Sequence, residues 1–143
     1  MKSSLALSLL ALLSLTGCNA LNTQPATESH IEGQWSLQQF YLQGSLVELG
    51  ERTRLQIMAE DEHSGRLSGN AGCNGFFGAY RVDNGKFSTG PIGATMMACP
   101  DDLMTQEQQF LKALEQLTSF SYDGQTLKLQ DESGQVKILM APE

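Results

Sequence analysis

The chain has 143 residues, and its 16 Asp and Glu outnumber its 9 Lys and Arg, which gives a formal net charge of −7 at pH 7. This acidic balance, without any basic cluster, argues against nucleic acid as a partner, because the phosphate backbone attracts positively charged surfaces. The length suits one domain of ordinary size behind a short leader, and the sequence has no internal repeat or second domain boundary.

The N-terminal segment has the features of a lipoprotein signal peptide, which is expected to cover residues 1–17. Lys2 supplies a positive charge, and the apolar run from Leu5 to Leu15 is shorter than the ~20 residues that a membrane-spanning helix needs. The run ends in Leu15-Thr16-Gly17-Cys18, which resembles the bacterial lipobox. That resemblance implies cleavage before Cys18 and acylation of its thiol. An ordinary secretory signal that contains a cysteine is the alternative.

Lipidation places the protein in the bacterial cell envelope, with a membrane as its partner through the lipid anchor. Asn19 follows the cysteine in place of Asp, and the usual sorting pattern then implies the outer membrane, facing the periplasm. Residues 18–32 are mostly small and polar, without an apolar period, so we expect a flexible, lipidated tether. The folded domain is expected to cover residues 33–143.

Short strands and tight turns are predicted over most of this domain. Trp35 lies on one face of the first strand, and a bulge past Gln39 brings Phe40 to the same face. Asp83-Asn84-Gly85 is a strong turn signal, because Asn and Gly tolerate positive φ. The predicted strands cover residues 33–42, 55–59, 66–69, 77–82, 86–88, 120–122, 126–130 and 136–140.

One amphipathic helix is predicted over residues 102–117. Its charged residues, Glu107 among them, are assigned to a solvated face, and Asp101 or Asp102 is expected to cap its N-terminus. Its apolar side chains recur at i, i+3, i+4 and i+7 and are Leu103, Phe110, Leu111, Leu114 and Leu117. The predicted fold class is therefore mainly β, of the α+β type: a small antiparallel β-barrel or strongly curved sheet with one amphipathic helix.

The stretch from Gly69 to Cys99 concentrates glycines, aromatic residues and the two cysteines that remain once Cys18 is acylated. Because exported chains meet an oxidising compartment, we expect a structural disulfide between Cys73 and Cys99; two reduced, buried thiols are the alternative. The glycines are expected at a corner of the barrel. Five apolar side chains either pack in the core, which is the preferred interpretation, or line an apolar groove: Phe76, Phe77, Tyr80, Met96 and Met97.

The sequence indicates no catalytic site, no metal site and no cofactor. A structural zinc site needs four closely spaced ligands, whereas His30 and His63 stand alone in the tether and in a turn. No histidine is placed to activate a cysteine, and the serines lack a Gly-x-Ser-x-Gly context. The acidic run Glu60-Asp61-Glu62 lacks the spacing of a calcium loop and is interpreted as a solvated turn. The protein is not expected to be an enzyme.

An ordered series of motifs along the chain resembles the META domain of the HslJ family. The series consists of Gly69-x-Ala71-Gly72-Cys73-Asn74-x-Phe76-x-Gly78-x-Tyr80, Gly93-Ala94-Thr95-Met96-Met97-Ala98-Cys99, Glu107-x-x-Phe110-Leu111-x-x-Leu114 and Gly124-x-x-Leu127-x-Leu129-x-Asp131. The resemblance implies a compact, barrel-like domain with one helix, found in bacterial envelope proteins that are often lipoproteins and are linked by name to heat shock and stress. It implies no enzymatic activity and no catalytic residue.

Two functions follow as hypotheses. The first is a non-catalytic, stress-related envelope lipoprotein that binds an apolar ligand or assists an envelope protein. The second is a thiol or redox protein, or an enzyme, that uses Cys73 and Cys99. A stable disulfide between the two cysteines leaves them only a structural role.

Overall fold

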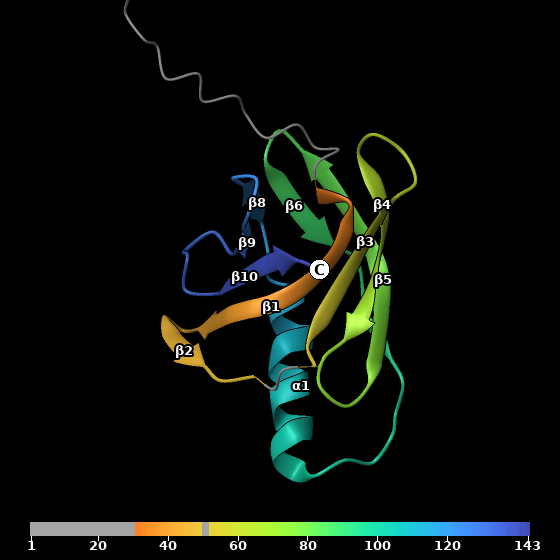
Figure 1. Cartoon of the computed structure of the whole chain (residues 1–143), viewed down its shortest axis with the longest axis vertical. Coiled ribbons are helices and arrows are strands. Elements are labelled where there is room, and N and C mark those ends of the chain that lie inside the picture. Colours follow the sequence, from red (N-terminus) through yellow and green to blue (C-terminus); the bar gives the residue numbers. More distant parts are fainter. Residues whose placement is uncertain (1–30, 50–51) are drawn as a thin grey trace, which may run out of the picture.

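Eight antiparallel strands close into a barrel in the computed structural model, which describes residues 31–49 and 52–143. These strands are β1 (Gly33–Leu42), β3 (Arg54–Ala59), β4 (Ser64–Asn70), β5 (Gly75–Asp83), β6 (Lys86–Thr89), β8 (Ser119–Tyr122), β9 (Leu127–Gln130) and β10 (Lys137–Pro142). They follow the order β1, β3, β4, β5, β6, β8, β9, β10, and β10 pairs back onto β1 (Figure 1). The predicted fold class is confirmed, and the sheet is closed.

Each predicted strand has a counterpart in this barrel, because alternation and turn signals define the hairpins locally. Leu55 and Ile57 of β3 are buried while their neighbours face outward, as the period of a strand requires. The turn between β5 and β6 has positive φ at Asn84 (49°) and Gly85 (79°), as the predicted turn signal requires. Two short strands were not predicted: β2 (Ser45–Val47) pairs with β1, and β7 (Gly93–Ala94) pairs with β5.

The predicted bulge in β1 lets two aromatic residues, one at an odd and one at an even position of the strand, both point into the barrel. The register between β1 and β10 shifts between Leu37 and Gln39. Trp35 and Phe40 lie five positions apart and belong to opposite faces of a regular strand. The extra residue of the bulge turns Phe40 inward, so both aromatic side chains are buried in the core.

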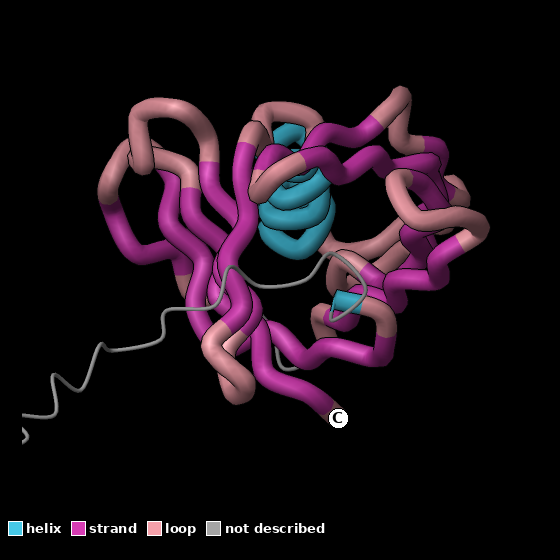
Figure 2. The backbone as a smooth tube through the Cα atoms, turned by 90° about the horizontal axis from the view of Figure 1, so that it is seen from above, coloured by secondary structure: helices cyan, strands magenta, loops and turns pink. Residues whose placement is uncertain are grey.

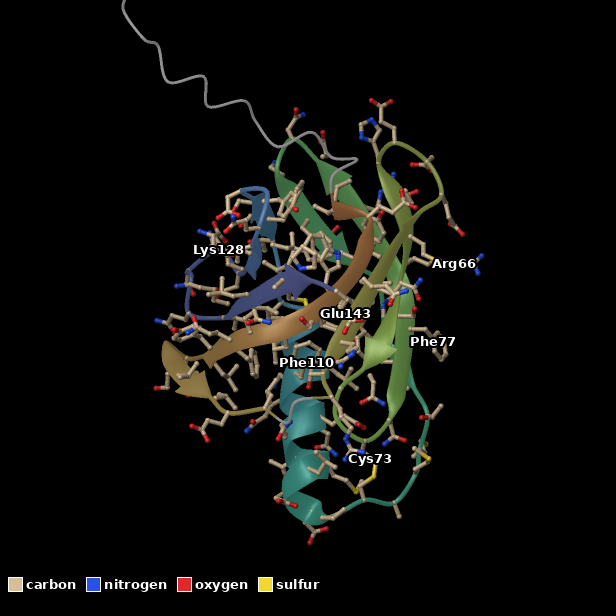
Figure 3. All side chains as sticks on the ribbon, in the orientation of Figure 1. Arg66, Cys73, Phe77, Phe110, Lys128 and Glu143 are labelled. Carbon is tan, nitrogen blue, oxygen red and sulfur yellow. A yellow bond between two sulfur atoms is a disulfide. The ribbon has the colours of Figure 1, made fainter. Side chains whose placement is uncertain are left out.

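The single described helix, α1 (Asp101–Leu114), closes one end of the barrel. Figure 2 shows it nearly end-on, with strands on either side. Phe110 is fully buried, and its ring centroid lies 5.7 Å from that of Phe40 and 6.1 Å from that of Phe76. The barrel interior is therefore filled with side chains from both the strands and the helix (Figure 3).

The ends of α1 differ from the prediction. Pro100 occupies the N-cap position without a side-chain cap, and Asp101 and Asp102 lie in the first turn instead. There the two carboxylates face the positive end of the helix dipole. The helix also ends at Leu114, but the turn that follows keeps Leu117 buried.

The core includes a residue that lies two positions before the predicted boundary of the domain. Ile31 is buried, and its carbonyl oxygen accepts a hydrogen bond of 2.9 Å from Nε1 of Trp35. Ile31 is therefore part of the core rather than of the tether. The predicted signal peptide, Cys18, His30 and most of the tether lie outside the described residues. Within 31–49 and 52–143, no helix has both the length and the apolar composition of a membrane span.

The turn between β8 and β9 yields a prediction about acid stability. Oδ1 of Asp123 accepts hydrogen bonds from the backbone N–H groups of Thr126 and Gln125, which hold the pKa of this carboxyl below its ordinary value. A lowered folded-state pKa adds stability above the unfolded-state pKa of about 3.9, and the gain disappears as the pH falls through the folded-state pKa. We expect Asp123→Asn to be less stable than the native chain at pH 7, and the difference should shrink as the pH falls below about 3.9, measured by thermal unfolding. A stability difference that does not change with pH contradicts this cause.

Candidate functional site

A disulfide joins the loop before β5 to the segment that leads into α1. Cys73 and Cys99 are bonded, with their Cα atoms 6.4 Å apart, within the usual range for a disulfide. The predicted disulfide is confirmed, and the alternative of two reduced thiols is wrong for this structure. Cys73 is buried, so the bond forms part of the packed end of the barrel (Figure 3).

Asn74 lies at the centre of a buried polar network beside this disulfide. Its side-chain oxygen accepts hydrogen bonds from Oγ1 of Thr95 (2.9 Å) and from the backbone N–H of Met97 (2.7 Å). Its side-chain nitrogen donates to Oε1 of Glu107 (2.9 Å) and to the carbonyl oxygen of Met97 (3.4 Å). All four hydrogen-bonding positions of the amide are therefore occupied. Such a satisfied network fixes one arrangement of the groups that it joins.

Glu107 is buried in α1, which corrects the prediction that it faces solvent. Its second carboxylate oxygen, Oε2, accepts a hydrogen bond of 2.5 Å from the backbone N–H of Asn74. A hydrogen bond to a charged group contributes roughly 1.5–3 kcal/mol, about twice a neutral one. The sequence holds a signal that was missed, because Glu107 stands four residues after Leu103 and three before Phe110. It occupies a position of the apolar stripe, where a charge needs a buried partner.

The network and the disulfide hold a segment that displays apolar side chains to solvent. Met96 is 97% exposed and Met97 is 57% exposed. Phe77, which is 62% exposed, pairs with Gly93 only a few residues earlier in the same segment. A Cβ at Gly93 would stand 2.8 Å from the Phe77 ring, so the aromatic ring lies against this glycine. We call Phe77, Met96 and Met97 the exposed strip; Figure 3 shows Phe77 pointing away from the barrel.

The apolar groove considered from the sequence is not formed. Phe76 and Tyr80 are buried in the core, on the opposite face of β5 from Phe77. Burial, together with the nearby charges of Glu32, Asp61 and Glu60, raises the pKa of the Tyr80 phenol. Core packing is thus confirmed for these two residues. Phe77, Met96 and Met97 lie on the outer surface instead.

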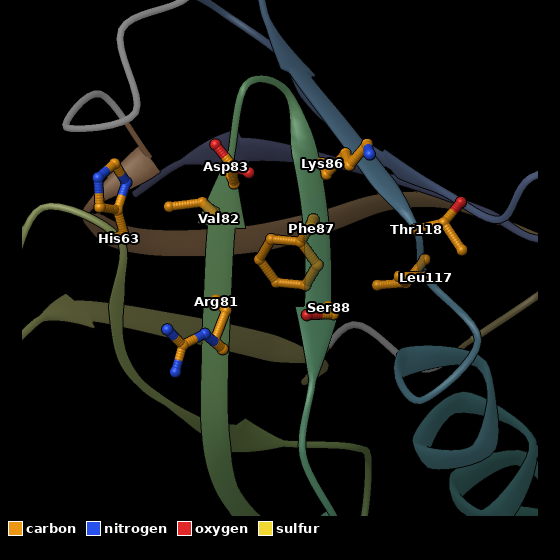
Figure 4. A pocket seen from close by; sticks show the side chains of 9 residues that line it. All are labelled: His63, Arg81, Val82, Asp83, Lys86, Phe87, Ser88, Leu117 and Thr118. Atoms are coloured by element: carbon orange, nitrogen blue, oxygen red, sulfur yellow. The ribbon is translucent and has the colours of Figure 1, made fainter.

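A surface depression lies beside the β5–β6 hairpin (Figure 4). Its floor consists of core residues, and its rim carries His63, Arg81, Asp83 and Lys86. In Figure 4 the charged ends of Arg81 and Lys86 point to opposite sides of the hairpin. Because the two cations do not converge on one point, the depression offers no clamp for an anion.

The acidic turn between β3 and β4 is organised by its own hydrogen bonds. Asp61 accepts from Oγ of Ser64 (2.7 Å) and from the backbone N–H of His63 (2.8 Å), which lowers the pKa of its carboxyl. Glu60 forms an ion pair of 2.7 Å with Arg66 of β4. In the part of the chain that the structure describes, no three His, Cys, Asp or Glu side chains are grouped to hold a metal ion.

The motif-bearing region that begins at Gly69 lies within a longer match to a known protein family. The sequence profile of the META domain matches residues 26–143. The chain belongs to the META domain family. The resemblance seen in the ordered motifs is therefore confirmed, and the Asn74 network lies in the part of this META domain where those motifs are densest. No curated protein matches the sequence.

Solved structures share the fold of this META domain. A protein from Burkholderia xenovorans, determined by NMR, superposes with a TM-score of 0.67 at 20% identity, and the match covers 92% of this chain and 99% of that one. A crystal structure of a DUF4847 family protein from Bacteroides vulgatus gives a TM-score of 0.59 at 14% identity, covering 78% and 93%. At these identities the likeness concerns the fold alone.

Proposed function

We propose that the protein is a lipid-anchored, non-catalytic lipoprotein of the bacterial cell envelope whose META domain binds an apolar segment of an envelope protein. The exposed strip carries this proposal, because Phe77, Met96 and Met97 are large apolar side chains open to solvent on an acidic chain. Large apolar side chains that stay exposed on one segment and on the strand it pairs with are candidates for an interaction site. The filled barrel interior argues against the version in which an apolar ligand enters the barrel.

The support beneath the strip strengthens this assignment. The backbone of Met97 is held at both its N–H and its carbonyl oxygen by the side chain of Asn74. A side chain presented on a backbone that is already ordered loses less conformational entropy on binding. The segment therefore offers Met96 and Met97 in a fixed position, as a preformed docking surface does.

The anchor and the cellular role come from the sequence. Acylation of Cys18 would hold the domain at the outer membrane, facing the periplasm, and the family resemblance links it to stress. The proposal includes no catalysis, since the sulfurs of Cys73 and Cys99 are tied in the disulfide and provide no thiolate nucleophile. The buried Cys73 is also poorly placed for thiol–disulfide exchange.

Photocrosslinking in intact cells tests the proposed binding. With p-benzoylphenylalanine in place of Phe77, we expect capture of a defined envelope protein, because the strip contacts its partner. The same group in place of Lys128, on the opposite side of the barrel in Figure 3, is the matched control and should capture little. Introducing Met96→Asp and Met97→Asp together should reduce capture at position 77 by roughly tenfold, since charge replaces apolar contact.

Two results would contradict this proposal. If capture is equal at positions 77 and 128, the strip is not the binding surface. The same conclusion holds if capture at position 77 survives the double aspartate substitution. A Cys18→Ser arm separates the anchor from the surface. This variant should leave the membrane fraction, whereas a variant that stays there removes the lipid from the proposal.

A further inference from the structure

We propose that Met96 and Met97 form a sulfoxidation site at which peroxide weakens binding through the exposed strip. The oxidation follows from the structure alone, whereas its effect on binding rests on the proposed function. The five described methionines differ widely in exposure: Met96 is 97% exposed, Met97 57% and Met58 46%, Met104 is half-buried, and Met140 is fully buried. Susceptibility of a thioether to oxidants follows its access to solvent.

Hydrogen bonds and the disulfide restrain the backbone that carries Met96 and Met97. The N–H of Thr95 donates to the carbonyl oxygen of Gly75 (2.9 Å), and Asn74 holds both sides of Met97. Two residues further on, Cys99 is fixed by the disulfide. Apolar side chains on an unrestrained loop would fold back onto the surface to escape water. Here the anchored backbone limits that escape, so the two thioethers stay open to small oxidants.

The chemistry needs no protein catalyst, and its oxidant is a hydroperoxide such as hydrogen peroxide. With hydrogen peroxide, a lone pair of the methionine sulfur attacks one peroxide oxygen and the O–O bond breaks. The leaving hydroxide takes the proton from the oxygen now bonded to sulfur, which yields water and the sulfoxide. The sulfur is oxidised by two electrons to the sulfoxide, and the peroxide is reduced by two. The proposed export to the envelope would put the protein in an oxidising compartment, and the peroxide comes from outside the protein.

The product changes the surface and leaves the fold intact. A sulfoxide is polar, so it removes apolar contact from the strip. Neither side chain belongs to the core, in contrast to Met140. Oxidation of Met96 and Met97 is therefore expected to leave the melting temperature of the domain unchanged while it weakens binding of an apolar partner.

Peptide mass spectrometry of the full chain after graded hydrogen peroxide tests the site. We expect Met96 to gain oxygen at least about tenfold faster than Met140, with Met97 and Met58 in between. In urea the rates should converge, because unfolding exposes all the methionines. Equal rates for Met96 and Met140 in the folded chain, or unequal rates that persist in urea, would overturn the site.

The effect on binding is measured as the ratio of position-77 crosslinking after a peroxide pulse to crosslinking before it. We expect a fall of about tenfold in the native chain and little change in Met96→Leu with Met97→Leu, which cannot form sulfoxides. Because each protein serves as its own reference, altered basal binding does not enter the ratio. Equal falls in both proteins overturn the switch. Absence of any partner before peroxide overturns the proposed function and the switch with it, while the order of oxidation is decided by the mass spectra.

Discussion

Replacing Asn74 with Asp is expected to lower the free energy of unfolding by about 3–5 kcal/mol, the range for disrupting a buried network that contains a charge. In the native chain the amide nitrogen of Asn74 donates to Oε1 of Glu107. Aspartate has no donor at that place and sets a second carboxylate beside the first, where both are buried. Urea denaturation at pH 7 measures the loss.

The pH dependence of Asn74→Asp separates charge repulsion from a general packing defect. The variant should regain part of its stability as the pH is lowered from 7, because two adjacent carboxylates favour uptake of a shared proton, which lets one donate to the other. The native chain has no second carboxylate at this place, so it lacks this source of recovery. A loss that is independent of pH would mean that repulsion at Glu107 is not its cause.

Asn70→Asp is the matched control, since Asn70 lies four residues earlier, at the end of β4 where the same loop begins. Its Oδ1 accepts the backbone N–H of Gly72 at 2.7 Å, and aspartate keeps that acceptor. The contact that is lost, from Nδ2 to the carbonyl oxygen of Cys73, is long at 3.5 Å. We expect a loss below about 1 kcal/mol. A loss as large as that of Asn74→Asp would assign the effect to the loop rather than to the network.

Most of the strands and turns were predicted correctly from local sequence patterns. Alternation marked β3 through Leu55 and Ile57, and the pair Asn84-Gly85 marked the hairpin of β5 and β6. The bulge in β1 was predicted because Trp35 and Phe40 are an odd number of positions apart and would otherwise point to opposite faces of the strand. Each of these features is set by residues that are neighbours in the sequence, which is why one sequence was enough to predict them.

Closure of the barrel could not be predicted in the same way. It depends on the pairing of β1 with β10, where Trp35 lies opposite Pro142 and Phe40 opposite Ile138. These residues are about a hundred positions apart, and hydrophobic period does not identify which strand edges meet. An open, strongly curved sheet and a closed barrel therefore have the same local signature.

The candidate site was predicted less well, because its members depend on contacts between distant elements. Phe76 and Phe77 were assigned together, although adjacent residues of a strand point to opposite faces; one is buried and the other exposed. Glu107 was assigned to solvent, since its partner Asn74 lies on another element 33 residues away. The disulfide was found because only two cysteines remained to pair.

Reducing the Cys73–Cys99 disulfide is expected to lower the free energy of unfolding by about 3.5 kcal/mol. The bond closes a loop with a sequence separation of 26 residues, and the chain-entropy relation gives roughly that figure for a loop of this length. For a domain of this size the melting temperature should fall by about 10–20 °C. Thermal unfolding with and without dithiothreitol measures the shift.

The double variant Cys73→Ser with Cys99→Ser provides the control for this effect. It should unfold at the temperature of the reduced native chain, and dithiothreitol should not shift it further. The core around Phe110 does not include the sulfurs, so both reduced forms should still fold cooperatively.

Loss of the disulfide also frees one end of the segment that presents Met96 and Met97, which leaves the Asn74 network as its main restraint. Reduction should therefore weaken crosslinking at position 77 under conditions where the barrel is still folded. Unchanged capture in the folded double variant would show that Asn74 alone is sufficient to hold the exposed strip.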